Sequence, residues 1–174
     1  ERKQAEEKAS RLVAIVESSA DAITGKDLDG IVTSWNKGAE RVYGYTESEM
    51  VGKPISILVP PEHADELPMI LEKIKMGEHI EHYETVRQRK DRQRIDISLT
   101  ISPLRDAEGK IIGASTIGRD ITERKQAEEN LRQMNERFSL AALAAHLGVW
   151  DWDIQKDELV WDDGMYELYG VKRE

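Results

Sequence analysis

The 174-residue sequence contains no cysteine. This excludes a disulfide framework, a zinc site with cysteine ligands and a catalytic thiolate. Long apolar runs are also missing, because the longest apolar-rich stretch, Leu140–Trp150, has 11 residues and contains a histidine, whereas a membrane span needs about 20. No secretory signal opens the chain. We therefore expect no membrane span in this chain and a cytoplasmic location.

Positive charge is scarce, since 25 Lys and Arg stand against 34 Asp and Glu and give a net charge of −9. Nucleic-acid surfaces need clustered Lys and Arg to contact phosphates, so we expect no nucleic-acid partner. The motifs of several enzyme classes are absent as well: there is no P-loop, no G-x-S-x-G and no H-E-x-x-H. The adjacent Glu62 and His63 do not form a catalytic constellation. We expect no catalytic residues and no enzymatic activity in this chain.

The sequence does contain a repeat. The heptapeptide ERKQAEE occupies residues 1–7 and returns at 123–129, an offset of 122. A weaker echo follows each copy, where Trp35 and Trp161 each precede the glycine of a Tyr-Gly pair by nine residues. The chain also opens in mid-pattern, so we expect it to be a piece of a longer protein. The predicted order is a linker helix over 1–19, a complete domain over 20–121, a coiled-coil-like linker helix over 122–137 and the truncated start of a second copy over 138–174.

Both linkers carry a narrow apolar stripe at helical spacing in an otherwise charged sequence. The two stripes are Ala5, Ala9, Leu12 and Val16, and Ala127, Leu131, Met134 and Phe138. Such a stripe lies on its own domain, pairs with a second chain or belongs to a solvated connector, and the sequence leaves these alternatives open. We expect a homodimer formed through the linker helices and the domain faces.

Between the linkers, the apolar pattern changes to that of alternating strands and short helices. In order, the predicted elements are a hairpin over 21–26 and 30–34, short helices over 36–43, 46–51 and 54–58, a longer helix over 62–76, and strands over 81–90, 94–102 and 110–121. The last strand is apolar enough to lie centrally in a sheet. Two strands, several small helices and three strands predict an α+β domain in which an antiparallel sheet covers a helical layer.

Three motifs within this domain carry a family resemblance: SWNKGAERVYGYTESEMVGK, PLRDAEGKIIG and GRDITERKQAEE. Together and in this order they resemble the PAS (Per-Arnt-Sim) sensor family, of the S-box type with its PAC motif, over residues 11–122. Residues 138–174 resemble the start of a second PAS domain. The resemblance implies a PAS fold, with a five-stranded antiparallel sheet, small flanking helices and a linker helix on each side. It also implies sensing rather than chemistry, in a tandem array upstream of a histidine kinase of a two-component system or a diguanylate cyclase.

The junction between the last strand and the second linker contains the predicted signal-transmission residues. By the resemblance, Asp120 and Thr122 match the family's D-I-T motif, whose side chains tie the last strand to the outgoing helix. Independently, Asp120 followed by Glu123 three residues later fits the pattern of a helix capping box. We therefore predict that Asp120, Thr122 and Glu123 form a hinge through which the domain moves that helix.

The ligand-pocket candidates rest on strand alternation and helical spacing. Alternation puts three residues of each of the last two strands on one face, and matching members of the family turn these positions towards the ligand space. Two isoleucines one helical turn apart close that space, and polar side chains on neighbouring strands serve a small ligand. The alternative is that the apolar members are simply core. The candidates are Ile70, Ile74, Tyr83, Thr85, Ile97, Leu99, Ile101, Ala114, Thr116 and Gly118.

The sequence does not identify a cofactor, and we expect either none or a small metabolite. The absence of cysteine excludes the flavin chemistry in which a cysteine adduct forms. Haem is disfavoured because the longer helix carries only His63, in its first turn, and the positions that match the family's haem ligand hold acids or Pro68. His79 and His82 lie three residues apart on a predicted strand and point to opposite faces, so we predict no metal site.

One departure from the family's pattern affects a turn. Relatives have Lys-Asp-Gly before the fourth strand, whereas here Lys90 and Asp91 are followed by Arg92. Because glycine adopts the left-handed backbone that such a turn requires at little cost, we expect a strained or longer loop here.

Two functions follow from these observations. The first is a sensory PAS module that senses a small ligand or a partner and transmits through its helical linkers to an output domain in the same polypeptide, a histidine kinase or a diguanylate cyclase absent from this chain. The alternative is a ligand-free structural PAS spacer that mediates dimerisation. Residues 150–161 form a Trp-rich hairpin that is too small to stand alone, so we expect it to dock on its own helix, the neighbouring domain or a second chain.

Overall fold

The computed structural model describes the backbone of residues 2–172 and the side chains of residues 3–4 and 6–172. The chain divides into two units, of which the first extends to Glu123 and the second starts at Arg124. Each unit is described by itself. Three of the residues assigned above to linkers or to the second copy, at positions 1, 173 and 174, lie outside the described residues, as does the side chain at position 5 of the first apolar stripe.

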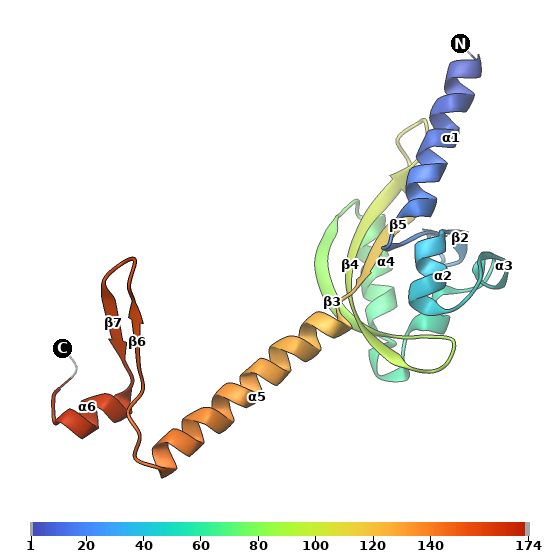
Figure 1. Ribbon diagram of the computed structural model, residues 1–174. Coiled ribbons are helices and arrows are strands. Elements are labelled where there is room, and N and C mark those ends of the chain that lie inside the picture. Colours follow the sequence, from blue (N-terminus) through green and yellow to red (C-terminus); the bar gives the residue numbers. More distant parts are fainter. Residues whose placement is uncertain (1, 173–174) are drawn as a thin grey trace. The chain divides into compact units, whose positions relative to one another are not determined.

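The first unit is built on a five-stranded antiparallel sheet, shown in Figure 1. Its strands are β1 (Ala22–Asp27), β2 (Val32–Trp35), β3 (Ile80–Gln88), β4 (Arg94–Arg105) and β5 (Ile111–Asp120). The strand order is β2-β1-β5-β4-β3, so the last strand lies in the centre and pairs with the first hairpin through β1. This confirms the α+β class, the five-stranded antiparallel sheet and the central position of the last strand.

Short helices cover one face of this sheet (Figure 1). They are α2 (Lys37–Tyr43), α3 (Glu47–Met50), the 3₁₀ turns Ile55–Leu58 and Pro61–His63, and α4 (Glu66–Lys75). Asn36 caps α2 as predicted, because its Oδ1 accepts a hydrogen bond of 2.8 Å from the backbone N–H of Ala39. The short helices therefore begin and end close to the predicted positions.

The predicted helix over 62–76 is wrong in its first four residues. The chain there forms a 3₁₀ turn that ends at His63, and the α-helix begins only at Glu66. Pro68 explains the break, because a proline lacks the N–H that would bond the carbonyl four residues earlier, and its ring clashes with that carbonyl. A proline is tolerated in the first turn of a helix, which is where α4 places it.

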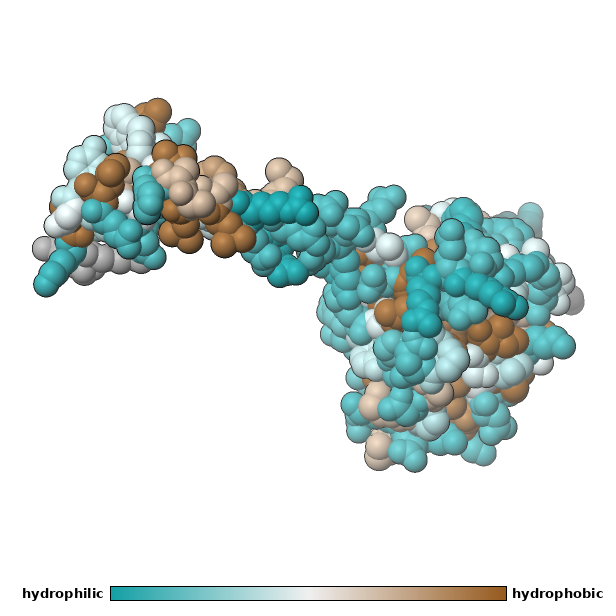
Figure 2. Space-filling view, turned by 90° about the horizontal axis from the view of Figure 1, so that it is seen from below, coloured by the Kyte–Doolittle hydropathy of each residue, from teal (hydrophilic) through white to brown (hydrophobic). Residues whose placement is uncertain are grey.

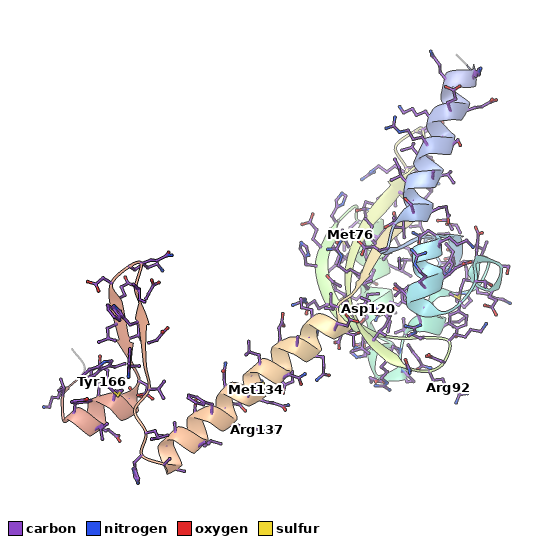
Figure 3. The ribbon with its side chains drawn as sticks, in the orientation of Figure 1. Met76, Arg92, Asp120, Met134, Arg137 and Tyr166 are labelled. Atoms are coloured by element: carbon purple, nitrogen blue, oxygen red, sulfur yellow. The ribbon has the colours of Figure 1, made fainter. Side chains whose placement is uncertain are left out.

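The turn between β3 and β4 is tight and places Arg92 in the left-handed region, with φ of 69°. The N–H of Arg92 donates to the carbonyl of Arg89 over 2.9 Å, and the N–H of Arg89 donates to the carbonyl of Gln93 over 2.9 Å. Figure 3 shows Arg92 in this turn. Of the two predicted outcomes, a strained turn and a longer one, the structure has the strained turn.

Helix α1 (Arg2–Ser18) joins the first unit at its C-terminal end. The Nδ2 of Asn36 donates to the carbonyl of Val16 over 2.8 Å, and the carboxylate of Glu17 accepts from the backbone N–H of Lys37 over 3.1 Å. Further towards the N-terminus the apolar stripe is uncovered, since Leu12 is 55% exposed. The end of the linker helix is therefore fixed to the domain, while the middle of its stripe has no cover within the first unit.

Helix α5 (Thr122–Ala144) runs from the end of the sheet into the second unit, seven residues past the end predicted for the linker helix. Its stripe is exposed in the single chain, and Met134, labelled in Figure 3, is 67% exposed. Among the described residues, no helix is both long enough and apolar enough to cross a membrane.

The second unit ends in a hairpin and a short helix, namely β6 (Trp150–Asp153), β7 (Glu158–Trp161) and α6 (Asp163–Tyr169). Trp161 packs against this helix, with its ring 5.2 Å from that of Tyr169, whereas Trp150 and Trp152 stay largely exposed. Apolar side chains gather on this unit in Figure 2. The docking expected of this hairpin is therefore met in part, by α6, and its other predicted contacts stay predictions.

Candidate functional site

A small cavity of about 30 Å³ lies inside the first unit, between the sheet and the helices that cover it. Its walls come from β1, β3, β4, β5, α2, α4 and the 3₁₀ turn Ile55–Leu58 with the residue that follows it. The wall formed by the helical layer is apolar and includes Leu58 and Ile70. The wall formed by the sheet is polar on β1, β5 and β3 and apolar on β4. Its polar residues are Thr24, Lys26, Arg87 and Thr116, and Leu99 and Ile101 of β4 lie among them. The cavity thus presents an apolar side and a cationic side to whatever occupies it.

Four of the ten predicted pocket residues line this cavity: Ile70, Leu99, Ile101 and Thr116. Four others are buried in the core of the unit without lining the cavity, namely Ile74, Ile97, Ala114 and Gly118. Thr85 is buried and Tyr83 half-buried on β3. Strand alternation therefore placed the apolar residues on the inner face correctly, while their role as ligand contacts stays a prediction.

Gly118 has a steric reason to be glycine. A Cβ built there would lie 3.0 Å from the hydroxyl oxygen of Tyr43 and 3.0 Å from a methyl carbon of Ile97. The absent side chain lets the buried Tyr43 of α2 approach the end of β5 closely. Gly118 therefore shapes the packing beside the cavity, and its role as a ligand contact stays a prediction.

The sequence reasoning missed Lys26, the most informative residue of the site. Lys26 lies on β1, is 5% exposed, and its Nζ donates a hydrogen bond of 2.6 Å to Oγ1 of Thr116 on β5. Burial, and then the positive charge of Arg87, lowers the pKa of Lys26 to about 8. The signal available in the sequence was alternation, because Ala22, Thr24 and Lys26 share one face of β1.

Arg87, the second buried cation, is held by a carboxylate. Its Nη1 donates to Oε2 of Glu66 over 2.9 Å, to Oγ1 of Thr85 over 3.2 Å and to the carbonyl of Val86 over 2.8 Å. Thr85 also donates to Glu66 over 2.7 Å. Partial burial raises the pKa of Glu66, but the hydrogen bonds from Thr85 and Arg87 outweigh that effect and lower it overall. Glu66 thus stays ionised and compensates Arg87.

The two cations differ in how their charge is balanced. Arg87 and Glu66 form an ion pair in which both side chains are mostly buried. No ion pair joins Lys26 to a carboxylate among residues 2–172, and its polar partner there is the hydroxyl of Thr116. Buried charges in proteins are as a rule paired, because an unpaired charge loses its hydration without replacement. The cationic wall therefore carries one uncompensated positive charge.

The predicted hinge residues lie at the junction between the end of β5 and the start of α5, where Figure 3 labels Asp120. Oδ1 of Asp120 accepts a hydrogen bond of 2.9 Å from the N–H of Thr122. Oγ1 of Thr122 accepts one of 3.0 Å from the N–H of Asp96 on β4. The start of α5 is thus tied to both central strands of the sheet.

The predicted capping box at this junction is not what forms. The carboxylate of Asp120 accepts from the residue two positions on, whereas a capping box bonds the residue three positions on, at Glu123. The reason is that α5 begins at Thr122, so Asp120 still belongs to β5 and lies one position before the capping position. Glu123 is an acidic residue in the first turn of α5. Its negative charge there interacts favourably with the positive end of the helix dipole.

Among the described residues there is no group of three or more His, Asp or Glu side chains that could hold a metal ion. His79 and His82 are both exposed, and His82 has a positive φ of 51° beside an irregularity in the pairing of β3 with β4. The Nδ1 of His79 lies 3.2 Å from the hydroxyl of Ser102.

Comparisons with known proteins agree with this architecture. A family model described as the PAS fold matches residues 10–121. The chain is 31% identical over 131 residues to the signal transduction histidine-protein kinase AtoS of Escherichia coli, covering 75% of this chain and 21% of AtoS. It is 28% identical over 173 residues to the probable diguanylate cyclase DgcE of the same organism, covering 98% of this chain and 16% of DgcE.

A solved structure gives the same picture. The first unit resembles the PAS domain of a protein from Colwellia psychrerythraea, with a TM-score of 0.60 and 27% identity over 66% of this chain and 98% of that one. The chain belongs to the PAS family. It carries a sensory PAS domain of a kind found in histidine kinases and diguanylate cyclases, and spans about a fifth or less of the length of those curated relatives.

Proposed function

We propose that this chain is a sensory module whose PAS domain binds a small ligand in its interior cavity and transmits the binding event through α5. The observation that carries the proposal is continuity along the two central strands. Thr116 and Leu99 line the cavity from β5 and β4, and the same two strands hold the start of α5 through Asp120 and through the backbone of Asp96. A ligand that displaces either strand therefore acts directly on the junction.

The energies at the junction suit this role. One intramolecular hydrogen bond is worth about 1 kcal/mol, and conformational states that exchange in signalling differ by a few kcal/mol. Two hydrogen bonds at the junction are thus sufficient to bias α5 between positions. The output would be a histidine kinase or diguanylate cyclase domain in the same polypeptide, which fits the length of the relatives.

The tandem arrangement is part of the proposal, and hydrogen bonds in the two units support it. Asn36 and Asp162 each directly follow a tryptophan, and each side chain caps a short helix and accepts from the backbone N–H thirteen residues earlier. The distances are 2.8 Å to Ile23 and 2.9 Å to Val149.

Aromatic packing repeats in the same way. The rings of Trp35 and Tyr43 are 5.4 Å apart, and those of Trp161 and Tyr169, eight residues apart like the first pair, are 5.2 Å apart. Both short helices then end at a left-handed glycine. We infer that residues 138–174 are the start of a second PAS domain, whose exposed tryptophans its own missing strands would cover.

A label experiment tests transmission. The chain has no native cysteine. Cysteines placed at the exposed positions Lys110 and Asn135, the latter outside the apolar stripe, therefore report the distance within one chain by electron spin resonance when the labelled chain is diluted with unlabelled chain. Small metabolites are first screened by thermal shift and by native mass spectrometry, and each that binds is added to the labelled chain. We expect the distance distribution to change, and to change less when Asp120→Ala and Thr122→Val are combined.

The competing function is the ligand-free spacer, and the small size of the cavity is the observation that favours it. A spacer would retain no metabolite after mild purification and would show no thermal shift with any compound. If a ligand binds but the label distance does not change, the proposal of ligand binding stands and the proposal of transmission through α5 is contradicted.

A further inference from the structure

We propose that the cavity of the first unit binds a small monocarboxylate, of about the size of formate or acetate, whose carboxylate pairs with the ammonium of Lys26. The inference rests on the proposed function, because it names the class of ligand for the same cavity.

The charge count favours a single negative charge. Two cations, Lys26 and Arg87, line the cavity, and Glu66 at 2.9 Å neutralises Arg87. One ammonium, buried to 5% exposure, is left without a carboxylate among the described residues. A monoanion balances this charge, whereas a dianion would leave a buried negative charge and a neutral ligand would leave the ammonium uncompensated.

Hydrogen-bond donors are arranged around the same ammonium. Thr116 accepts from Lys26 through Oγ1, so its hydroxyl hydrogen is free to turn towards an acceptor in the cavity. Thr24 faces Thr116 directly across the strand pair and lines the cavity too. An ammonium with one hydroxyl beside it, and a second hydroxyl in the same cavity lining, offers donors to the two oxygens of a carboxylate.

The volume sets the size of the ligand. About 30 Å³ holds about two to three water-sized groups, which limits the ligand to an acid of about three or four covalently bonded non-hydrogen atoms. Ordinary ligand sites measure about 300–1,000 Å³. Haem and flavin do not fit the cavity in this conformation.

The apolar wall distinguishes a carboxylate from an inorganic anion. Leu58 and Ile70, which belong to the helical layer, face the polar side chains of the sheet across the cavity, and an anion such as nitrate would place a polar oxygen against them. A carboxylate ends in a hydrogen or a methyl group, which makes favourable apolar contacts there. The cavity is thus complementary to a charged head and a very short apolar tail.

Titration of the full chain with acetate, followed by two-dimensional NMR at constant ionic strength, tests the inference. We expect saturable shifts for residues around Lys26 and Thr116, with a Kd of about 0.1–10 mM because so small a ligand makes few contacts. Formate should also bind, and butyrate, which exceeds the cavity, at least tenfold more weakly. Acetamide, the neutral analogue of the same shape, and nitrate should produce no saturable shift.

Lys26→Met removes the charge and keeps the length of the side chain, so we expect it to weaken acetate binding at least tenfold. The matched control is Lys110→Met, at an exposed lysine, which should bind acetate as the natural chain does. Thr116→Val, which keeps the ammonium and removes one hydroxyl, should weaken binding by a smaller factor. The NMR spectrum of each variant shows whether the fold is intact.

The outcomes separate the two proposals. If acetamide binds as well as acetate, or if Lys26→Met binds acetate unchanged, the carboxylate assignment is overturned while ligand binding in the cavity stands. If another class of metabolite occupies the cavity and acetate does not, the same conclusion follows. If no compound of any class binds, both the carboxylate assignment and the sensory function fail.

Discussion

Lys26 lies in an environment that its side chain rarely occupies. Lysine is among the residues least often fully buried, because its ammonium loses strong hydration. Here that cost is offset in the single chain by one hydroxyl, Oγ1 of Thr116 at 2.6 Å. A buried ammonium without a counter-charge lowers the free energy of unfolding. The size of this cost can be measured by replacing the lysine.

Lys26→Met should stabilise the ligand-free domain. Burial lowers the pKa of Lys26 from 10.5 to about 8, so the folded state disfavours the charged form by about 3 kcal/mol at pH 7. Because the folded pKa lies below the unfolded one, this cost is complete below pH 8 and disappears as the pH rises towards 10.5. Urea denaturation of both proteins should show a difference of about 3 kcal/mol at pH 7.

The same comparison at pH 9.5 should show a smaller difference. The other charged or titratable groups that line the cavity are Arg87, whose partner is Glu66, and Tyr43. Hydrogen bonds from Thr85 and Arg87 lower the pKa of Glu66, so Glu66 stays ionised through this range. Burial raises the pKa of Tyr43, so Tyr43 stays neutral at pH 9.5. A Lys26→Met variant that is no more stable than the natural chain at pH 7 would show that the ammonium is solvated or paired.

Glu66→Gln should destabilise the first unit by about 2 kcal/mol. The carboxylate of Glu66 accepts from Arg87 and Thr85, and its loss leaves the mostly buried guanidinium without a counter-charge. Glu72→Gln, on the exposed face of the same helix, is the control and should change the unfolding free energy by less than about 0.5 kcal/mol. Equal effects at the two positions in chemical denaturation would contradict this role of the ion pair.

At the scale of elements, the turn between β3 and β4 stores strain. Arg92 has a φ of 69°, a conformation that costs a residue with a Cβ about 1 kcal/mol relative to glycine. Arg92→Gly should therefore raise the unfolding free energy by about 0.5–1 kcal/mol in chemical denaturation. Arg92→Ala, which removes the same side chain but keeps the Cβ, should give no such gain, and an equal gain would attribute the effect to the charge instead.

The junction between β5 and α5 makes a prediction about local opening. Thr122→Val keeps the shape of the side chain but removes the acceptor for the N–H of Asp96. The loss of about 1 kcal/mol should speed amide hydrogen exchange at residues 121–123 about fivefold. Thr33→Val, at an exposed position of β2, should leave those amides unchanged. Unchanged exchange in Thr122→Val would show that this hydrogen bond does not hold the start of α5.

At the scale of the whole molecule, both linker helices carry apolar stripes that the single chain leaves exposed. Leu131, Met134 and Phe138 are each more than half exposed on α5, and Leu12 is on α1. Scattered exposed apolar residues are ordinary, whereas a continuous stripe at helical spacing in a charged helix is typical of a coiled-coil seam. We therefore propose dimerisation through these helices.

Sedimentation velocity tests the dimer. Leu131→Glu combined with Met134→Glu should weaken self-association at least tenfold, because two charges would be buried in the seam. Asn135→Glu adds a charge at an exposed position outside the stripe and should leave association unchanged. A strictly monomeric natural chain at millimolar concentration would contradict the proposal.

Much of the first unit could be predicted from the sequence because its signals are local. Asn36 before a helix, Gly109 in the turn between the last strands and the alternation of Ile97, Leu99 and Ile101 each depend on nearby residues. The error lies at Pro68, which excludes the first residues of the predicted helix over 62–76 from α4.

The sequence by itself determined the order of elements, the inner face of the sheet and the PAS family, because these follow from short-range periodicity and motifs. Only the tertiary structure showed the polar wall of the cavity. Lys26 meets Thr116 across 90 residues of sequence, and Arg87 meets Glu66 only when β3 lies beside α4. A lysine on a strand next to a turn is usually solvated. Its burial is decided by the long-range pairing of β1 with β5, which local sequence does not specify.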